Sequence, residues 1–386
     1  MIGQETLPYH YVTTDINHWY VVIKQGRVEK AKEMKRKVEE EFQIMEKNED
    51  VAVYIQLLNL RHQLMLSYLE PDSADNIEEA YTTVKNAKNN VAPDSLTDVI
   101  EFYYHFFTGM YHFRTKDLVV ALTYYREAER YLDMLDNEDE TNKAEFYFKV
   151  AEVYYYMKET HFSMNYAQRA YTIFKEQKDK DGNLTYGKQM VQCQFVISGN
   201  WLDKMCYEEA LHHANKAYED AERIQEQHLI GSAHFNIGIC YNQLEELDKA
   251  EYHFQKSYDI HRKRGHIYES KAIFNLAYVK AKKNNLEQTE LLYNEGKLVA
   301  KRHDNKEILE KLKLIKGLYL SYDLNVVREA FKFFKDKSMY ADMEEYAVAV
   351  AELLNNREKV HEAVEFYRTA IEARRQIQRG SHLDEK

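Results

Sequence analysis

Four polar side chains on nearby predicted helices could bind a ligand in a common groove. They are Asn200, Asp203, Asn236 and Asn275. A side-chain amide both donates and accepts hydrogen bonds, so it can hold the backbone of an extended peptide. A carboxylate inside a groove can pair with a cationic side chain of that peptide. We therefore predict a peptide-binding site, with helix-capping or packing amides as the alternative.

Sequence motifs of common enzyme and metal sites are absent. The chain has no phosphate-binding loop, no GxSxG, no HExxH and no paired CxxC. Six histidines are scattered over the predicted helices, where packing or surface roles are the expected ones: His161, His212, His213, His234, His253 and His261. The acidic run 136–140 is expected to be a solvated loop. We predict no metal and no cofactor.

Small and aromatic residues recur at fixed offsets along most of the chain. In the stretch 234–260 they occupy the positions of a tetratricopeptide repeat (TPR) helix pair: Gly238, Tyr241, Ala250, Phe254 and Ser257. The same offsets surround six further first-helix anchors: Gly109, Ala151, Ser198, Ala277, Leu318 and Ala351. The spacing is about 40 residues instead of the usual ~34, so the helices or the linkers are longer than usual. Such repeats stack to bury a shared core, which predicts a superhelix of about seven repeats over residues 96–376.

The predicted repeats indicate which way the polar side chains point. In a TPR superhelix the first helix of each pair lines the concave groove. Asn236 and Asn275 stand two residues before their anchors, a position that points into the groove. Asp203 stands five residues past its anchor, which also faces the groove, and Asn200 lies on the same helix.

The N-terminal part of the chain lacks this repeat pattern. Residues 1–15 are expected to form an arm, followed by amphipathic helices over 15–24, 27–46 and 50–68. Short loops between them predict a three-helix bundle at 1–70, as a separate domain. Pro71 and Pro93 bound a linker at 71–95 that carries one helix from Asn76 to Lys88. Residues 377–386 are predicted to be a polar tail. The fold class is therefore all-α.

Composition excludes several classes of protein. Only 12 Gly and 3 Pro among 386 residues fit a nearly all-helical chain. The net charge of −11 argues against a general nucleic-acid binder. No apolar run approaches the roughly 18 residues of a membrane span, and no signal peptide is evident. The cysteines Cys193, Cys206 and Cys240 lack metal-site spacing, so we expect reduced thiols in a cytoplasmic protein.

Longer motifs resemble a known family. They are NHWY (17–20), LRHQLMLSYLEP (60–71), FFTGMYHFR (106–114), KAEFYFKVAEVYYYMKETHFSMNYA (143–167), SGNWLD (198–203) and HFNIGICY (234–241). Together these segments resemble the Rap family over nearly the whole chain. That family comprises response-regulator aspartate phosphatases and antagonists of spore-forming bacteria, which act in quorum sensing and are switched by Phr pentapeptides. The resemblance implies that the bundle binds a response regulator, that the repeats bind the peptide, and that Asp203 and Asn236 anchor it. An anionic Asp203 favours a peptide that contains Arg.

One segment departs from the family pattern. Family phosphatases have a Gln after an acidic stretch, and the resemblance implies that this Gln orients water at the partner's aspartyl phosphate. Here residues 45–50 read MEKNED, and Glu49 stands at the position of the Gln, between Asn48 and Asp50. An ionised carboxylate is repelled by a phosphoryl group and cannot donate a hydrogen bond to it.

We therefore predict that the chain inhibits its partner without catalysis. Asn48, Glu49 and Asp50 would contact the response regulator, or its DNA-binding domain. The alternative is an active phosphatase in which Glu49 is a general base.

Two other classes remain open from the sequence. A TPR adaptor that clamps a protein's C-terminus would use groove cations, for which Lys149 and Lys282 are the candidates. A peptide-responsive transcription factor would need an N-terminal helix-turn-helix, and no such motif is evident.

Overall fold

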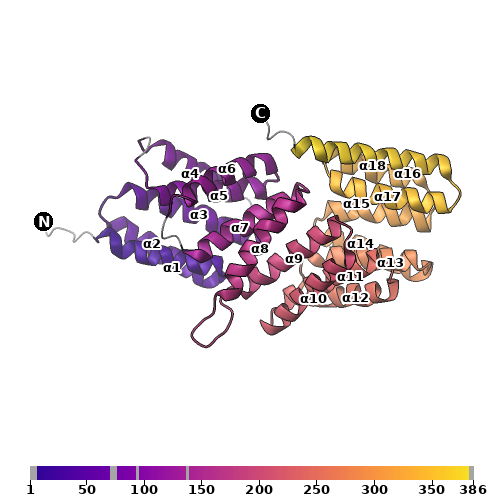
Figure 1. The fold of residues 1–386 in the computed structure, drawn as a ribbon, viewed down its shortest axis with the longest axis horizontal. Helices are drawn as coiled ribbons and strands as arrows, with labels where there is room; N and C mark the ends of the chain where they lie inside the picture. The colour runs from indigo at the N-terminus through magenta and orange to yellow at the C-terminus, as the bar shows by residue number, and fades with distance from the viewer. Residues whose placement is uncertain (1–6, 70–75, 93–94, 136–138, 382–386) are drawn as a thin grey trace. The chain divides into compact units, whose positions relative to one another are not determined.

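The chain is built of α-helices (Figure 1). The computed structural model describes residues 7–69, 76–92, 95–135 and 139–381, and none of these residues lies in a β-strand. The prediction of an all-α protein is confirmed. Pro and Gly are sparse in the chain, and Leu, Ala, Glu and Lys, which favour helix, are frequent.

The first four helices are α1 (Tyr9–Lys24), α2 (Val28–Ile44), α3 (Glu49–Leu69) and α4 (Asn76–Asn89). The three predicted N-terminal helices and the linker helix are thus present. The predicted arm was too long, because α1 begins at Tyr9. Val12 and Ile16 lie on the buried face of α1 together with Trp19, so burial extends the helix toward the N-terminus. Of the predicted linker, residues 71–75, including Pro71, and Pro93 lie outside the described residues.

Seven helix pairs follow α4 within the part of the chain that the structure describes. They are α5 (Asp98–Arg114) with α6 (Leu118–Leu132), α7 (Glu140–Tyr156) with α8 (Thr160–Glu176), α9 (Gly187–Asp203) with α10 (Tyr207–Arg223), α11 (Gln227–Gln243) with α12 (Leu247–Arg264), α13 (Tyr268–Lys282) with α14 (Leu286–Arg302), α15 (Lys306–Ile315) with α16 (Leu324–Asp336), and α17 (Tyr340–Asn356) with α18 (Val360–Ser381). Most of these helices have about 17 residues. The wide repeat spacing therefore comes from long helices.

Close packing explains the small residues at the anchors. A Cβ atom on Gly238 would lie 2.8 Å from Cδ1 of Phe254, well inside van der Waals contact. The Phe254 ring is buried against α13, where it packs on Leu276 and Val279. The glycine thus lets the second helix approach the first, and the aromatic ring fills the gap to the next repeat.

The sixth repeat is irregular. Its first helix changes to a π-helix over Lys316–Leu320, which contains the weak anchor Leu318. The neighbouring Gly317 is packed so closely that a Cβ there would meet the Asp323 carbonyl oxygen at 2.7 Å. The repeat pattern predicts the anchor at Leu318, whereas the glycine that permits this contact stands one residue earlier, at Gly317.

The helices divide into two compact units, residues 1–153 and 154–386. The first unit contains α1–α6 and most of α7, so the helices of the predicted bundle pack in one unit with the first repeats. The second unit contains the remaining repeats. The predicted domain boundaries at 70 and 95 stay predictions, because this division only groups helices by their contacts. The last helix also continues to Ser381, past the predicted end of the repeats at 376.

Candidate functional site

The turn between α2 and α3 holds the residues predicted to bind a partner. The Asn48 side chain accepts a hydrogen bond from the backbone N–H of Val51 at 3.0 Å, so it caps α3. Asp50 accepts from the backbone N–H of Thr97 at 3.4 Å, which joins the turn to the segment before α5. Glu49 is exposed. Two of the three side chains thus fix the turn, and Glu49 is left to face solvent.

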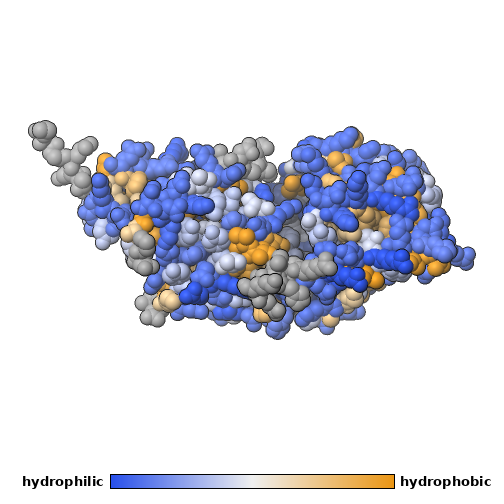
Figure 2. Space-filling model, turned by 90° about the horizontal axis from the view of Figure 1, so that it is seen from above, coloured by the Kyte–Doolittle hydropathy of each residue, from blue (hydrophilic) through white to orange (hydrophobic). Residues whose placement is uncertain are grey.

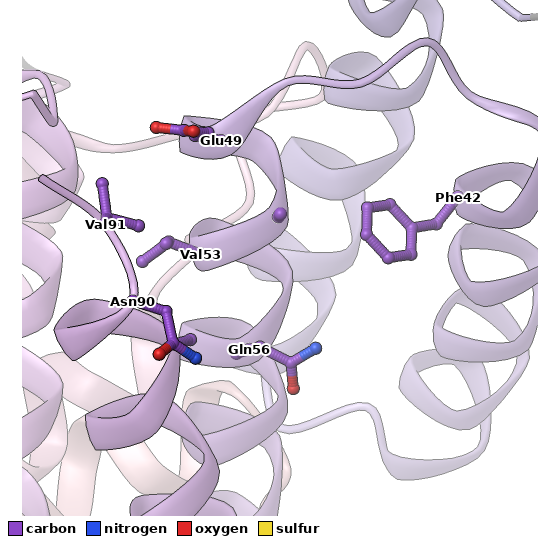
Figure 3. A pocket seen from close by; sticks show the side chains of 8 residues that line it. Phe42, Glu49, Val53, Gln56, Asn90 and Val91 are labelled. Carbon is purple, nitrogen blue, oxygen red and sulfur yellow. The ribbon is translucent and has the colours of Figure 1, made fainter.

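A shallow pocket lies beside Glu49 in the first unit (Figure 3). Its volume is about 280 Å³. It is lined from α2, α3, α4 and the turn after α4 by Phe42, Glu49, Ala52, Val53, Gln56, Ala87, Asn90 and Val91. The view shows Glu49 at the start of α3, with Val91 and Val53 near it and the Phe42 ring pointing from α2 toward α3. The surroundings of Glu49 are therefore apolar and amide side chains, which suit protein contact better than binding of a free anion.

A buried ion pair connects α3 to α7 in the first unit. Arg61 donates to Glu145 from Nη2 at 2.6 Å and from Nε at 3.2 Å, and Tyr20 of α1 donates to the other carboxylate oxygen at 2.8 Å. Burial alone would raise the pKa of Glu145, but the charges of Arg61 and Lys24 outweigh it and lower that pKa. Lys24 also donates to Thr141 and Asn142 on α7. The first and third helices are thereby tied to the second repeat by charged hydrogen bonds.

In the second unit, Asp203 is already paired. Its Oδ1 accepts a hydrogen bond from Lys158 Nζ at 2.7 Å. Lys158 lies in the turn after α7 with a positive φ of 62°, and it also lies over the Tyr155 ring. That ring packs on α9, where a Cβ on Gly199 would meet the Tyr155 hydroxyl at 2.7 Å. Close packing of α7 on α9 therefore places a cation at the predicted anchor for the peptide.

A second carboxylate lies near this pair. The Glu345 side chain on α17 is exposed to solvent, yet desolvation by the surrounding protein and the carboxylates of Asp342 and Asp203 raise its pKa. The opposing charges of Lys311 and Lys158 lower it in part. Lys158 therefore pairs directly with Asp203 and interacts electrostatically with Glu345, which comes from a distant part of the sequence.

The three predicted asparagines differ in accessibility. Asn236 on α11 is half-buried, and its side chain makes no hydrogen bond with any residue that the structure describes. Asn275 on α13 is also half-buried, and its amide donates to the Lys271 carbonyl at 3.0 Å. Asn200 is fully buried and donates to the Ser163 hydroxyl at 2.8 Å. The structure therefore gives Asn200 a packing role between α9 and α8, and only Asn236 and Asn275 are accessible to a ligand.

The accessible candidates lie on first helices that are neighbours. The helix α9 contacts α11, and α11 contacts α13. Asp203, Asn236 and Asn275 thus come from three consecutive first helices. The sequence pattern missed Lys158 and Glu345, because their proximity to Asp203 depends on how repeats stack and leaves no local signal.

The two lysines considered for a carboxylate clamp are both engaged. Lys149 pairs with Glu152 at 2.6 Å, and Lys282 pairs with Glu245 at 2.8 Å and donates to Asn242.

In the described parts of the chain, no three His, Cys, Asp or Glu side chains are placed to hold a metal ion. Within the same residues, no helix combines the length and apolar character that crossing a membrane requires.

Comparison with known proteins identifies the family. Residues 6–67 match the family model "response regulator aspartate phosphatase H, N terminal", and residues 202–263 match a tetratricopeptide repeat model. The chain is 40% identical to response regulator aspartate phosphatase I of Bacillus subtilis (strain 168), over 100% of this chain and 96% of that protein. The chain belongs to the Rap family.

Two further Rap proteins are similar to the chain over nearly its whole length. Regulatory protein RapF of Bacillus subtilis (strain 168) is 31% identical over 96% of both chains. A crystal structure of a Rap protein complexed with competence and sporulation factor is 32% identical, with a TM-score of 0.85 over 96% of this chain and 99% of that one. The resemblance seen in the sequence motifs is thus confirmed. The names of the Rap relatives include both phosphatases and regulatory proteins, so family membership leaves the mode of action open.

Proposed function

We propose that this Rap protein inhibits a response regulator by binding it, without hydrolysing its aspartyl phosphate, and that a peptide in the second unit controls this binding. The main support for this proposal is that the side chain of Glu49 is exposed. A carboxylate at this corner would oppose a phosphoryl group, whereas it can pair with the cationic surface of a receiver or DNA-binding domain.

The geometry of the first unit supports protein binding at this corner. Asn48 and Asp50 hold the turn rigidly, and the pocket beside Glu49 offers apolar contact from Phe42 and Val91. An apolar pocket rimmed by polar groups is the usual form of a contact that carries binding energy between proteins. The occupant would be a side chain of the regulator.

The second unit supports a cationic peptide as the controlling ligand. Asp203 and Glu345 supply negative charge, and Asn236 has unused donors and acceptors. The Rap relative that was crystallised in complex with competence and sporulation factor supports control by a bound factor. We propose a Phr-type pentapeptide that contains Arg, because a guanidinium group pairs with a carboxylate in planar geometry.

The names of the phosphatase relatives favour a second candidate function. In that case Glu49 would act as a general base on the attacking water. The two candidates differ in the fate of the phosphoryl group on the regulator.

Loss of radiolabel from a phosphorylated response regulator separates them. The assay uses purified regulators of the host, phosphorylated by a sensor kinase, with their own hydrolysis as the baseline. We expect the unmodified protein to bind and inhibit a regulator without accelerating label loss. We expect Glu49→Ala to leave inhibition nearly intact, because an exposed ion pair with the regulator contributes little to binding. Rapid label loss with the unmodified protein that disappears in Glu49→Ala and Glu49→Gln would establish the phosphatase instead.

A further inference from the structure

Two histidines in the second unit share a hydrogen bond between their ring nitrogens. The Nδ1 atoms of His234 on α11 and His253 on α12 lie 2.9 Å apart. In such a bond one Nδ1 carries the proton and the other accepts it. The contact therefore requires that at least one of the two rings is neutral.

Aromatic side chains enclose the pair. Tyr218 of α10 packs on His234 with a centroid distance of 4.9 Å, and Tyr241 of α11 stacks on His253 at 5.6 Å. Burial lowers the pKa of His234 to about 4, with further contributions from His253 and Lys256, and burial also lowers the pKa of His253. Figure 2 shows hydrophilic residues over most of the face that it presents, where a charged ring would stay hydrated. Between these tyrosines a charged ring loses that hydration.

The other titratable groups around the pair do not offset a positive charge on it. Tyr252 of α12 lies edge-on to His253 with a centroid distance of 5.1 Å. On α10, the charge of Glu222 acts on the Tyr218 hydroxyl. Among the residues that the structure describes, α9 and α13, which flank α11, contribute no charge that shifts the pKa of either ring. Two charged rings would therefore face each other without a carboxylate between them.

The packing of α11 on α12 leaves the rings little room to separate. Phe254, the residue after His253, packs so closely on Gly238 of α11 that a Cβ there would lie 2.8 Å from the ring. Repulsion between the histidines would therefore act on the packing of the two helices. Asn236 lies two residues after His234 on α11 and would move with that helix.

We propose that the His234–His253 pair is a pH-sensitive contact, which holds α11 against α12 at neutral pH and releases this helix pair in acid. A first proton leaves the contact intact, because the charged ring donates and the neutral ring accepts. A second proton places an N–H group on both Nδ1 atoms and breaks it. Weaker peptide binding in acid would follow only if the proposed peptide site is correct, whereas the contact itself does not depend on that site.

The direction of the pH effect follows from the lowered pKa values. A histidine in an unfolded chain has a pKa of about 6.5. The stabilisation by the neutral pair is complete above that pH, and it is lost as the pH falls toward the lower folded-state values. Below pH 6.5, each ring that stays neutral in the folded state raises the unfolding equilibrium constant by up to about tenfold per pH unit.

Urea unfolding of the full chain between pH 7.5 and pH 5.0 tests the proposal. The fluorescence of Trp201 on α9 reports the second unit in a Trp19→Phe background, since the chain has two tryptophans. His253→Asn removes one titrating ring and keeps an amide near the position of Nδ1. The rise in the unfolding constant from pH 6.5 to pH 5.0 should be about tenfold smaller in this variant. His212→Asn is the matched control, because His212 is exposed on α10, and it should behave as the unmodified protein.

Nuclear magnetic resonance of histidine labelled at Cε1 follows both rings in the unmodified folded chain, so the proposal can be tested even if a variant does not fold. His234 should stay neutral down to about pH 5, and its titration should move to higher pH in His253→Asn, because the neighbouring ring is gone. Titration of both rings near pH 6.5 in the folded protein would overturn the proposal. So would the same pH dependence of unfolding in the unmodified protein and His253→Asn, or an equal change in His212→Asn.

Discussion

At the scale of single residues, the pairing of Asp203 with Lys158 bears most on ligand binding. The ammonium group lies 2.7 Å from Oδ1, where the proposed peptide guanidinium would bind, and about a quarter of each side chain is exposed. When a cation of the protein itself must be displaced or shared, the free energy gained by binding a cation of the peptide is smaller. In the proposed site, Lys158 would therefore influence the affinity for the peptide as well as the position of Asp203.

Replacing Lys158 by Met should strengthen binding of an Arg-containing pentapeptide by about three- to tenfold, the range of a partly exposed ion pair. Asp203 and Glu345 would then face the peptide without a competing charge. Isothermal titration calorimetry measures the change. Lys256→Met on α12, a second helix, removes the same charge and should have no effect. Weaker binding by Lys158→Met would mean that Lys158 contacts the peptide itself.

Asn236 should contribute to the same site through its amide. Asn236→Ala should weaken peptide binding by about 1–3 kcal/mol, because it leaves a buried backbone group of the peptide without its partner. Asn200→Ala is the contrasting change. It should lower thermal stability, since Asn200 is buried against Ser163, and alter affinity only through that loss. Unchanged peptide affinity in both Asn236→Ala and Asp203→Ala would show that the peptide does not bind in this groove.

At the scale of helices, the contact between α3 and α7 depends on one buried ion pair. Arg61 and Glu145 are both buried, and Tyr20 and Lys24 complete the hydrogen bonding. Removing one partner of such a pair leaves a buried charge uncompensated. The docking of the first helices on the second repeat should therefore respond to mutation and to acid.

Glu145→Gln should lower the free energy of unfolding of the first unit by about 3 kcal/mol at neutral pH. The folded-state pKa of Glu145 is lowered, so its stabilisation is present above the unfolded-state pKa of about 4.3 and is lost as pH falls through the lower folded value. The difference between the two proteins in urea unfolding should thus shrink in acid. Hydrogen exchange should show α1 and α3 opening first.

The exposed pair of Glu33 and Lys30 provides the control for this change. Glu33→Gln removes an ion pair of 2.9 Å on the surface of α2, and it should leave the free energy of unfolding nearly unchanged, because solvent screens an exposed pair. An equal effect of Glu33→Gln and Glu145→Gln would contradict the structural role given to Glu145.

At the scale of the whole molecule, the two units should respond separately to the peptide. The proposed ligand contacts residues of the second unit, and the proposed partner contacts the first. Differential scanning calorimetry should resolve two transitions. Peptide at about 100 times its dissociation constant should stabilise the second unit by about 2.7 kcal/mol. Asp203→Ala should abolish that shift, whereas an equal shift of both transitions would show that the units unfold together.

The sequence by itself determined the helices, their pairing and the family. Helix periodicity and the small–aromatic offsets are local properties, so Gly238 and Phe254 could be assigned from a stretch of fewer than 30 residues. The candidate anchors Asp203, Asn236 and Asn275 followed from the same offsets.

Only the tertiary structure decided which of these groups are available and what surrounds them. Asn200 and Asp203 lie on one helix three residues apart, yet the first is buried against α8 and the second is paired with Lys158. Arg61 and Glu145 are 84 residues apart, and their contact depends on how α3 packs against a repeat. Such contacts are fixed by the stacking of helices, which sums many weak packing preferences over the whole unit. No short stretch of sequence contains that information.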